Sequence, residues 1–138
     1  MIEYWLKEYN IDGYRFDLSK GFTQKNNPND VNAFGAYDAS RIAIWKEYHD
    51  SLQQYSRGAY TILEHFADNS EEKVLSDYGI LLWGNSNYNY NEGTMGYVNS
   101  SDVSWSLSQE RNWSKSLLIS YMESHDEERL MYKNVFIN

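Results

Sequence analysis

The sequence predicts an α/β fold in which parallel strands alternate with helices. Four short segments are rich in apolar and β-favouring residues, at residues 11–18, 59–66, 79–84 and 117–126. The last three are nearly continuous in apolar character, which is typical of strands covered on both faces. Between the segments, apolar residues recur every three to four positions, as they do on one face of a helix. Strands and helices that alternate in this way form βα units and a parallel sheet.

Composition limits the class of protein and its partners. The 138 residues suffice for one domain with a core, and a hydrophobic content of 41% is too high for a disordered tail. A formal net charge of -8 argues against nucleic acid and against an anionic membrane surface as partners. No apolar run approaches the ~20 residues of a membrane-spanning helix, and no secretory leader opens the chain. Without cysteine the chain has no disulfide or thiolate site, and its cysteine content does not indicate a cellular compartment.

The first segment is expected to be a helix over residues 1–9, because its apolar residues follow helical spacing. The strand at residues 11–18 comes directly after it, with Tyr14 and Phe16 as β-favouring residues. A helix that leads straight into a buried strand normally has another strand before it. We therefore expect the chain to be a piece of a longer protein.

Two further helices are expected in the middle of the chain. Asp30 is the expected N-cap of a long helix that runs to Tyr55 and is closed by Arg57-Gly58. Its aromatic residues are expected to pack against the sheet. After the strand at residues 59–66, Asp68 caps a shorter helix that reaches Asp77.

The last third of the chain is predicted to contain a functional loop. Residues 85–102 are rich in Asn, Gly, Tyr and Ser and show no apolar period, which is typical of a long functional loop. Residues 105–113 and 127–133 are expected to be helices on either side of the strand at 117–126.

Polar residues end three of the predicted strands. Asp17 and Glu64 each end one, and the pair His125-Asp126 ends another. In parallel α/β folds, ligands bind beyond the carboxyl ends of the strands, whether the sheet is open or closed into a barrel. We therefore expect these four side chains to share one site.

Arg15 and Asp17 lie two residues apart and so point to the same face of their strand. The neighbouring cation would keep the carboxylate ionised. An ionised carboxylate of this kind is a nucleophile, a metal ligand or half of a salt bridge. This stretch alone leaves the three interpretations open.

A pair of carboxyl groups is what retaining cleavage of a glycosidic bond requires. Asp17, kept ionised by Arg15, would attack the anomeric carbon. Glu64 follows Ile62 and Leu63, and an apolar surrounding would help it to hold the proton that the leaving oxygen needs.

Three segments resemble sequence motifs of the α-amylase family, glycoside hydrolase family 13. Residues 12–20 (DGYRFDLSK) are similar to its strand-four motif, residues 62–66 (ILEHF) to its strand-five motif, and residues 122–126 (MESHD) to its strand-seven motif. The resemblance implies that residues 1–138 are a partial catalytic domain. They would form strands four to seven of a (β/α)8 TIM barrel, about half of a fold that takes about 250 residues when complete.

By this resemblance the protein would be a retaining glycoside hydrolase that acts on α-1,4-linked glucans such as starch and maltooligosaccharides. Asp17 would be the nucleophile and Glu64 the general acid/base. Asp126 would be a third catalytic acid, which binds substrate hydroxyls and stabilises the transition state.

The resemblance also implies substrate-binding residues. Arg15 would orient Asp17, His125 would bind sugar hydroxyls, and Lys20 would reach toward the leaving-group side. We expect Tyr88 and Tyr90, in the loop at residues 85–102, to stack on sugar rings.

The sequence departs from the family pattern at two positions. Gly21 stands where the family often has histidine, and Ser124 stands where asparagine is common. Gly21 weakens the inference of a calcium or acceptor-side sugar contact at that point. The resemblance is also compatible with a structural calcium ion in a full-length enzyme. It is compatible with an extracytoplasmic location as well.

Half a barrel leaves two sheet edges unpaired. We therefore expect this chain to be weak or inactive by itself, and its exposed edges to pair with a second copy.

Other functions stay open. Asp17, His65, His125 and Asp126 could instead ligate a divalent ion in a metal-dependent hydrolase. The thirteen Tyr and five Trp also suit a non-catalytic carbohydrate-binding fragment, although binding alone does not require acids at three strand ends. Trp83 is expected to pack against the loop rather than to stack on a sugar. Within the family, an α-glucan transglycosidase such as a branching enzyme is the alternative to a hydrolase.

Overall fold

Four parallel strands form one sheet. The computed structural model describes residues 2–27 and 29–137, with β1 (Gly13–Phe16), β2 (Tyr60–Leu63), β3 (Leu81–Asn85) and β4 (Leu118–Tyr121). The strands pair in the order β1-β2-β3-β4, and every pair is parallel. All four predicted strands are present, each shorter than expected. The predicted α/β class is confirmed, and the sheet is consistent with part of a (β/α)8 barrel.

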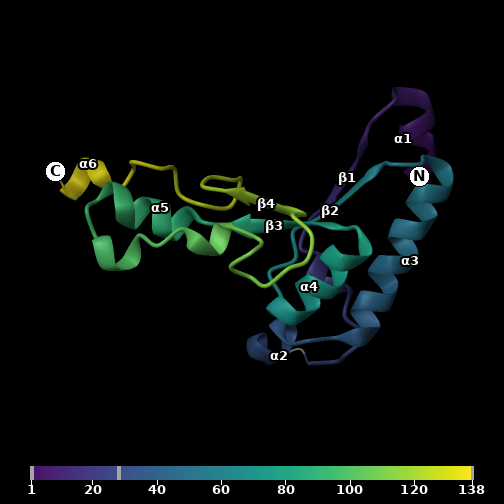
Figure 1. Ribbon diagram of the computed structural model, residues 1–138, viewed down its shortest axis with the longest axis horizontal. Helices are drawn as coiled ribbons and strands as arrows, with labels where there is room; N and C mark the ends of the chain where they lie inside the picture. Colours follow the sequence, from purple (N-terminus) through teal and green to yellow (C-terminus); the bar gives the residue numbers. More distant parts are fainter. Residues whose placement is uncertain (1, 28, 138) are drawn as a thin grey trace.

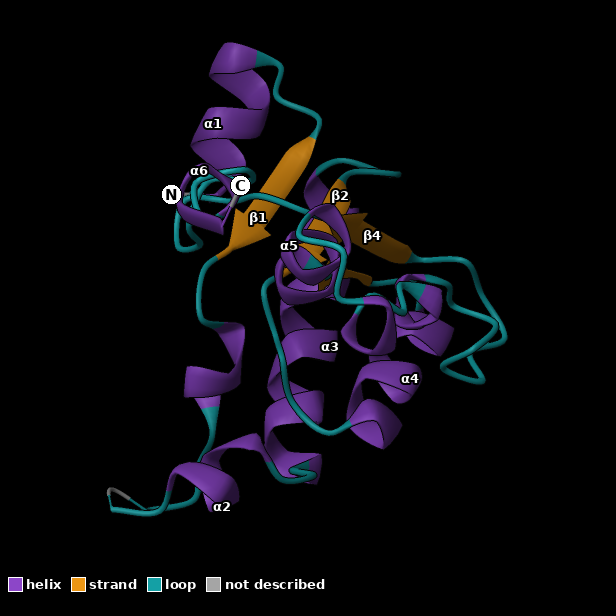
Figure 2. Cartoon of the chain, turned by 90° about the vertical axis from the view of Figure 1, so that its left-hand side faces the viewer, coloured by secondary structure: helices purple, strands orange, loops and turns teal. Residues whose placement is uncertain are grey.

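Helices precede and follow the strands: α1 (Ile2–Tyr9), α2 (Val31–Gly35), α3 (Ala39–Tyr55), α4 (Asn69–Tyr78), α5 (Asn87–Thr94) and α6 (Asn134–Ile137). The molecule is elongated, with α1 and α3 at one end and α5 and α6 at the other (Figure 1). Figure 2 shows α3 and α4 side by side on one side of the sheet. None of the described helices is both long and apolar enough to span a membrane.

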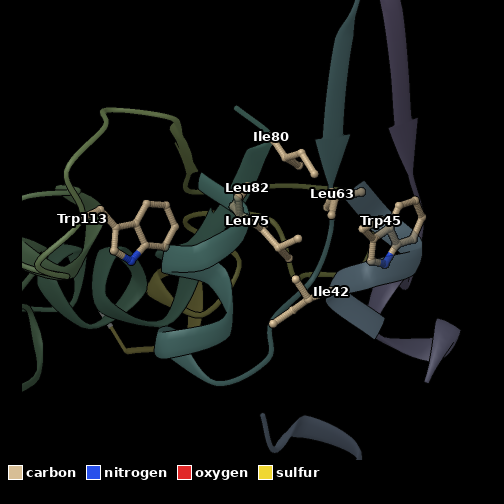
Figure 3. Packing of buried hydrophobic residues seen from close by; sticks show 7 residues of the cluster. All are labelled: Ile42, Trp45, Leu63, Leu75, Ile80, Leu82 and Trp113. Carbon is tan, nitrogen blue, oxygen red and sulfur yellow. The ribbon is translucent and has the colours of Figure 1, made fainter. Parts of the chain in front are cut away.

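The main core lies between the sheet and helices α3 and α4. Leu63 and Leu82 are fully buried and pack with side chains from these helices and from the segments before β3 and β4 (Figure 3): Ile42, Trp45, Leu75, Ile80 and Trp113. Because side chains alternate along a strand, Ile62 and Trp83 point to the opposite face of the sheet. The helices therefore cover one face, and the other face is left for the site.

A close approach of two strands requires Gly13 at the start of β1. A Cβ atom at this position would lie 2.3 Å from the carbonyl oxygen of Tyr60 on β2. Only glycine lets the two backbones pair here.

The predicted long helix is interrupted. The segment expected from Asp30 to Tyr55 forms α2 and then α3, separated at residues 36–38. Asp30 caps α2 as predicted, and its side chain accepts the backbone N–H of Ala33. Asp38 starts a second helix, because its carboxylate accepts the backbone N–H of Ser40.

The other predictions for the last third were partly wrong. The expected loop at residues 85–102 contains α5, a polar helix in which the Asn91 amide donates to Asn87. Residues 105–113 are not helical beyond a short 3-10 turn (Ser104–Ser106), because Asn112 adopts left-handed backbone angles. Residues 127–133 are not helical either: the segment is irregular up to a turn at residues 130–133, where the Glu123 carboxylate accepts the backbone N–H of Leu130.

Candidate active site

The strand register brings the two principal acids together. Phe16 pairs with Leu63, and the backbone N–H of Glu64 donates to the Phe16 carbonyl oxygen over 3.0 Å. Asp17 and Glu64 are therefore neighbours at the carboxyl ends of β1 and β2. This is the edge where parallel α/β folds bind their ligands.

Arg15 contacts both carboxylates. Its Nη1 lies 2.6 Å from Asp17 Oδ1, and its Nη2 forms an ion pair with Glu64 Oε2. The guanidinium carbon lies 4.1 Å from the centre of the Trp83 ring, which holds the cation on the open face of the sheet. The expected pairing of Arg15 with Asp17 is present, and Glu64 shares the same cation.

Glu64 is buried, but its surroundings differ from the apolar pocket that the sequence suggested. Leu63 points away into the core on the helix side, and the closest group to the carboxylate is the Arg15 guanidinium. The Glu64 carboxylate is therefore held by a cation rather than enclosed by apolar side chains.

His125 reaches the same place from the segment after β4. Its Nε2 lies 3.4 Å from Asp17 Oδ1 and 3.6 Å from Asp126 Oδ1. The His125 and Asp126 side chains are more than half exposed. Asp126 thus stands at the rim of the site and meets Asp17 only through His125.

One oxygen of Asp17, one oxygen of Glu64 and one ring nitrogen of His125 all lie within 4.8 Å of one another. Such a set resembles a ligand set for a divalent ion. The Arg15 cation in contact with both carboxylates disfavours a second positive charge at this point. The arrangement suits a pair of carboxyl groups that act on a neutral substrate.

His65 is not part of this cluster. It is fully buried, and its two ring nitrogens lie 2.7 Å from Ser19 Oγ and from Glu71 Oε1. The hypothesis of a metal site that includes His65 is therefore wrong.

Lys20 is directed at the turn after β2. Its Nζ donates to the Phe66 carbonyl oxygen over 3.4 Å and lies 5.5 Å from the Phe34 ring centre. It lies beside the segment that carries Glu64, rather than in contact with a carboxylate.

Tyr88 and Tyr90 both lie on α5, not in an irregular loop. Tyr88 is exposed, and Tyr90 lines a small hollow of about 100 Å³ together with Ser86, Ser106, Ser120, Tyr121 and Met122. Neither contacts Asp17 or Glu64 through a hydrogen bond in the described part of the chain.

The sequence prediction missed Trp83 and Tyr121 as site residues. The Trp83 ring centre lies 5.0 Å from that of Tyr121 and 6.4 Å from that of His125. Burial, and then Glu127, raise the pKa of Tyr121 to about 12, so its hydroxyl stays a hydrogen-bond donor at neutral pH. Trp83 could have been found from the strand register, because Leu63 pairs with Leu82 and Trp83 therefore lies beside Glu64.

A family model described as the alpha-amylase catalytic domain matches residues 1–137. The chain belongs to the alpha-amylase catalytic-domain family. This confirms the resemblance carried by the three strand-end motifs. No curated protein matched the sequence. Membership in the alpha-amylase family indicates a function of the glycosidase or transglycosidase type.

Proposed function

We propose that the protein is a retaining glycoside hydrolase that acts on α-1,4-linked glucans, with Asp17 as nucleophile and Glu64 as general acid/base. The spacing of the two carboxylates supports this proposal, because oxygens of the two groups lie within 4.8 Å. Retaining enzymes hold their carboxyl groups about 5–5.5 Å apart, whereas inverting enzymes need about 6.5–9.5 Å to admit a water molecule. The choice of an α-1,4-linked glucan rests on the resemblance to the family.

The reaction proceeds in two displacements. A carboxylate oxygen of Asp17 attacks the anomeric carbon while the glycosidic bond breaks, and Glu64 gives its proton to the departing oxygen. A glycosyl ester on Asp17 results. Glu64, now a carboxylate, takes a proton from water, the water oxygen attacks the anomeric carbon, and the ester bond to Asp17 breaks. Configuration at the anomeric carbon is retained.

The remaining residues would bind and orient the sugar. Arg15 stays hydrogen-bonded to Asp17 and holds its carboxylate in place when substrate displaces it from Glu64. His125 and Asp126, at the rim, would bind ring hydroxyls, and Asp126 would stabilise the positive charge that develops at the transition state. Lys20 would contribute on the leaving-group side after a shift from Phe66.

Aromatic side chains would supply the apolar contact. The rings of Tyr88 and Tyr90 on α5 would stack against pyranose faces, in keeping with their exposure and the aromatic content of the chain.

The test compares Glu64→Gln with the wild type on two substrates, maltopentaose and α-maltosyl fluoride. Loss of the acid should reduce release of reducing ends from maltopentaose by roughly 10²–10⁴-fold. Turnover of the fluoride should fall much less, because fluoride leaves without a proton. The exposed Glu110→Gln serves as the matched control and should behave as wild type.

Equal losses on both substrates would contradict the role of Glu64. Products longer than maltopentaose would favour the transglycosidase alternative. Binding of maltopentaose without turnover of either substrate would favour the carbohydrate-binding fragment.

A further inference from the structure

A polar network lies buried behind the two acids. It consists of Ser19 after β1, Arg41 on α3, His65 after β2 and Glu71 on α4, and we refer to these four residues as the buried network. Each is at most 1% exposed. Beside the apolar core, the segment after β1, helix α3, the segment after β2 and helix α4 therefore also meet through charged and polar side chains.

Hydrogen bonds satisfy the charged members of the buried network. Arg41 donates from Nε and Nη2 to Glu71 over 2.7 and 2.8 Å, and its other bonds reach the carbonyl oxygens of Lys20, Phe34 and Ala36. Glu71 also accepts the backbone N–H of Asp38 over 2.8 Å. A buried ion pair with every donor used holds one geometry, since any displacement would leave a polar group unpaired.

The direction of the bonds through His65 follows from the charges. Burial lowers the pKa of His65, so the ring is neutral at pH 7. Glu71 is ionised, because the hydrogen bonds from His65 and Arg41 outweigh the effect of burial on its pKa. His65 therefore donates from Nε2 to Glu71, and its Nδ1 is an acceptor that shares the Ser19 hydroxyl proton with the carbonyl oxygen of Glu64.

Serine, histidine and glutamate in this order resemble the nucleophilic triad of a serine hydrolase. Ser19, His65 and Glu71 are each 0% exposed, so no substrate carbonyl could reach the hydroxyl. The arrangement must act through the groups that it holds.

The groups that it holds are the turns that follow the two acids. The backbone N–H of Ser19 donates to the carbonyl oxygen of Glu64 over 2.9 Å, and the Ser19 hydroxyl lies 2.9 Å from the same oxygen. Leu18 and Phe66 have left-handed backbone angles, with φ of 43° and 49°. Such angles are unfavourable for residues with a Cβ and persist only when the surroundings enforce them.

We infer that the buried network is a positioning device, which fixes the turns after β1 and β2 and thereby the spacing of the Asp17 and Glu64 carboxylates. This inference rests on the proposed function of those two acids. Ser19, His65, Glu71 and Arg41 are positioning residues that do not touch the sugar.

The test uses Ser19→Ala, which removes the link between His65 and the turn after β1 but keeps the Arg41–Glu71 ion pair. Ser76→Ala is the matched control, because Ser76 is also 0% exposed but lies on α4 outside the network. Both variants are compared with wild type in thermal unfolding, in kcat and KM for α-maltosyl fluoride, and in amide hydrogen exchange.

We expect Ser19→Ala to lower kcat by roughly 10–100-fold with KM within about twofold, because small displacements of reacting groups carry costs of this size. Hydrogen exchange should accelerate at residues 17–20 and 64–66 but not in β3 and β4. Ser76→Ala should show neither effect.

A loss of kcat no larger than that of Ser76→Ala would overturn the inference, as would unchanged exchange at the two turns. If the wild-type chain turns over no glycoside, as expected of an incomplete barrel, the exchange experiment alone decides the inference. Faster exchange at both turns in Ser19→Ala would then still support a device that holds them.

Discussion

Two adjacent residues on α4, Glu71 and Glu72, show how partners decide the state of a buried acid. Burial raises the pKa of Glu71, but bonds from His65 and Arg41 bring it below its ordinary value. Glu72 is also buried, and its single ion pair, 3.1 Å from Arg111, does not compensate. Burial therefore raises the pKa of Glu72 from 4.5 to about 7.

Glu72 should make stability depend on pH in the mildly acidic range. A carboxyl group with a raised pKa binds its proton more tightly in the folded state, so its contribution is greatest below pH 4.5 and is lost as pH rises through 7. Relative to Glu72→Gln, the wild type should lose up to about 3 kcal/mol of unfolding free energy over this range, at about 1.36 kcal/mol per pKa unit.

Urea denaturation of both proteins from pH 4.5 to 7.5 measures this difference. The exposed Glu110→Gln should run parallel to the wild type. If the difference in unfolding free energy between the wild type and Glu72→Gln does not change with pH, the raised pKa of Glu72 is contradicted.

Among single residues, the sequence identified the two acids but not the side chains that hold them in place. Asp17 and Glu64 were predictable because each ends a strand, where a polar residue is costly unless it is functional. Glu71 looked like an ordinary acid in the first turn of a helix, which is usually solvated. Its burial depends on how α3 and α4 pack against each other, and spacing along the chain does not report that.

Among the elements, strands and long helices were predictable because burial imposes a period on the sequence. Helix α5 was missed because it has few apolar residues and is held by polar contacts such as Asn91 to Asn87. The break between α2 and α3 depends on Asp38, which the sequence did not distinguish from other polar residues in the expected helix. Local side-chain bonds to the backbone override periodicity in these places.

Strands β1 and β4 each have one edge without a partner strand in residues 2–27 and 29–137. We propose that these edges pair with a second copy of the chain, as open sheet edges tend to do. Sedimentation velocity over a concentration series should show a shift from monomer to dimer.

Trp5→Lys is the control for this prediction, because Trp5 is an exposed apolar residue on α1 and not part of either edge. A monomer at all concentrations would contradict edge pairing. Association abolished by Trp5→Lys would assign the contact to α1 instead.

For the molecule as a whole, the main organising feature is that the two faces of the sheet carry different groups of side chains. Helices α3 and α4 cover one face with an apolar core, and the buried network ties their ends to the turns behind the acids. Arg15, Asp17, Glu64 and Trp83 gather on the other face at the carboxyl ends of the strands. These four parallel strands thus bring oxygens of two strand-end carboxylates within 4.8 Å of each other.

The most direct measurement is covalent trapping with 5-fluoro-α-D-glucosyl fluoride, followed by intact mass and peptide mapping. We expect one 5-fluoroglucosyl group on Asp17 in the wild type and also in Glu64→Gln, because fluoride leaves without a proton donor. Asp17→Asn should remain unlabelled. A label on another residue, or a label that Asp17→Asn still acquires, would contradict the assignment of Asp17 as the nucleophile.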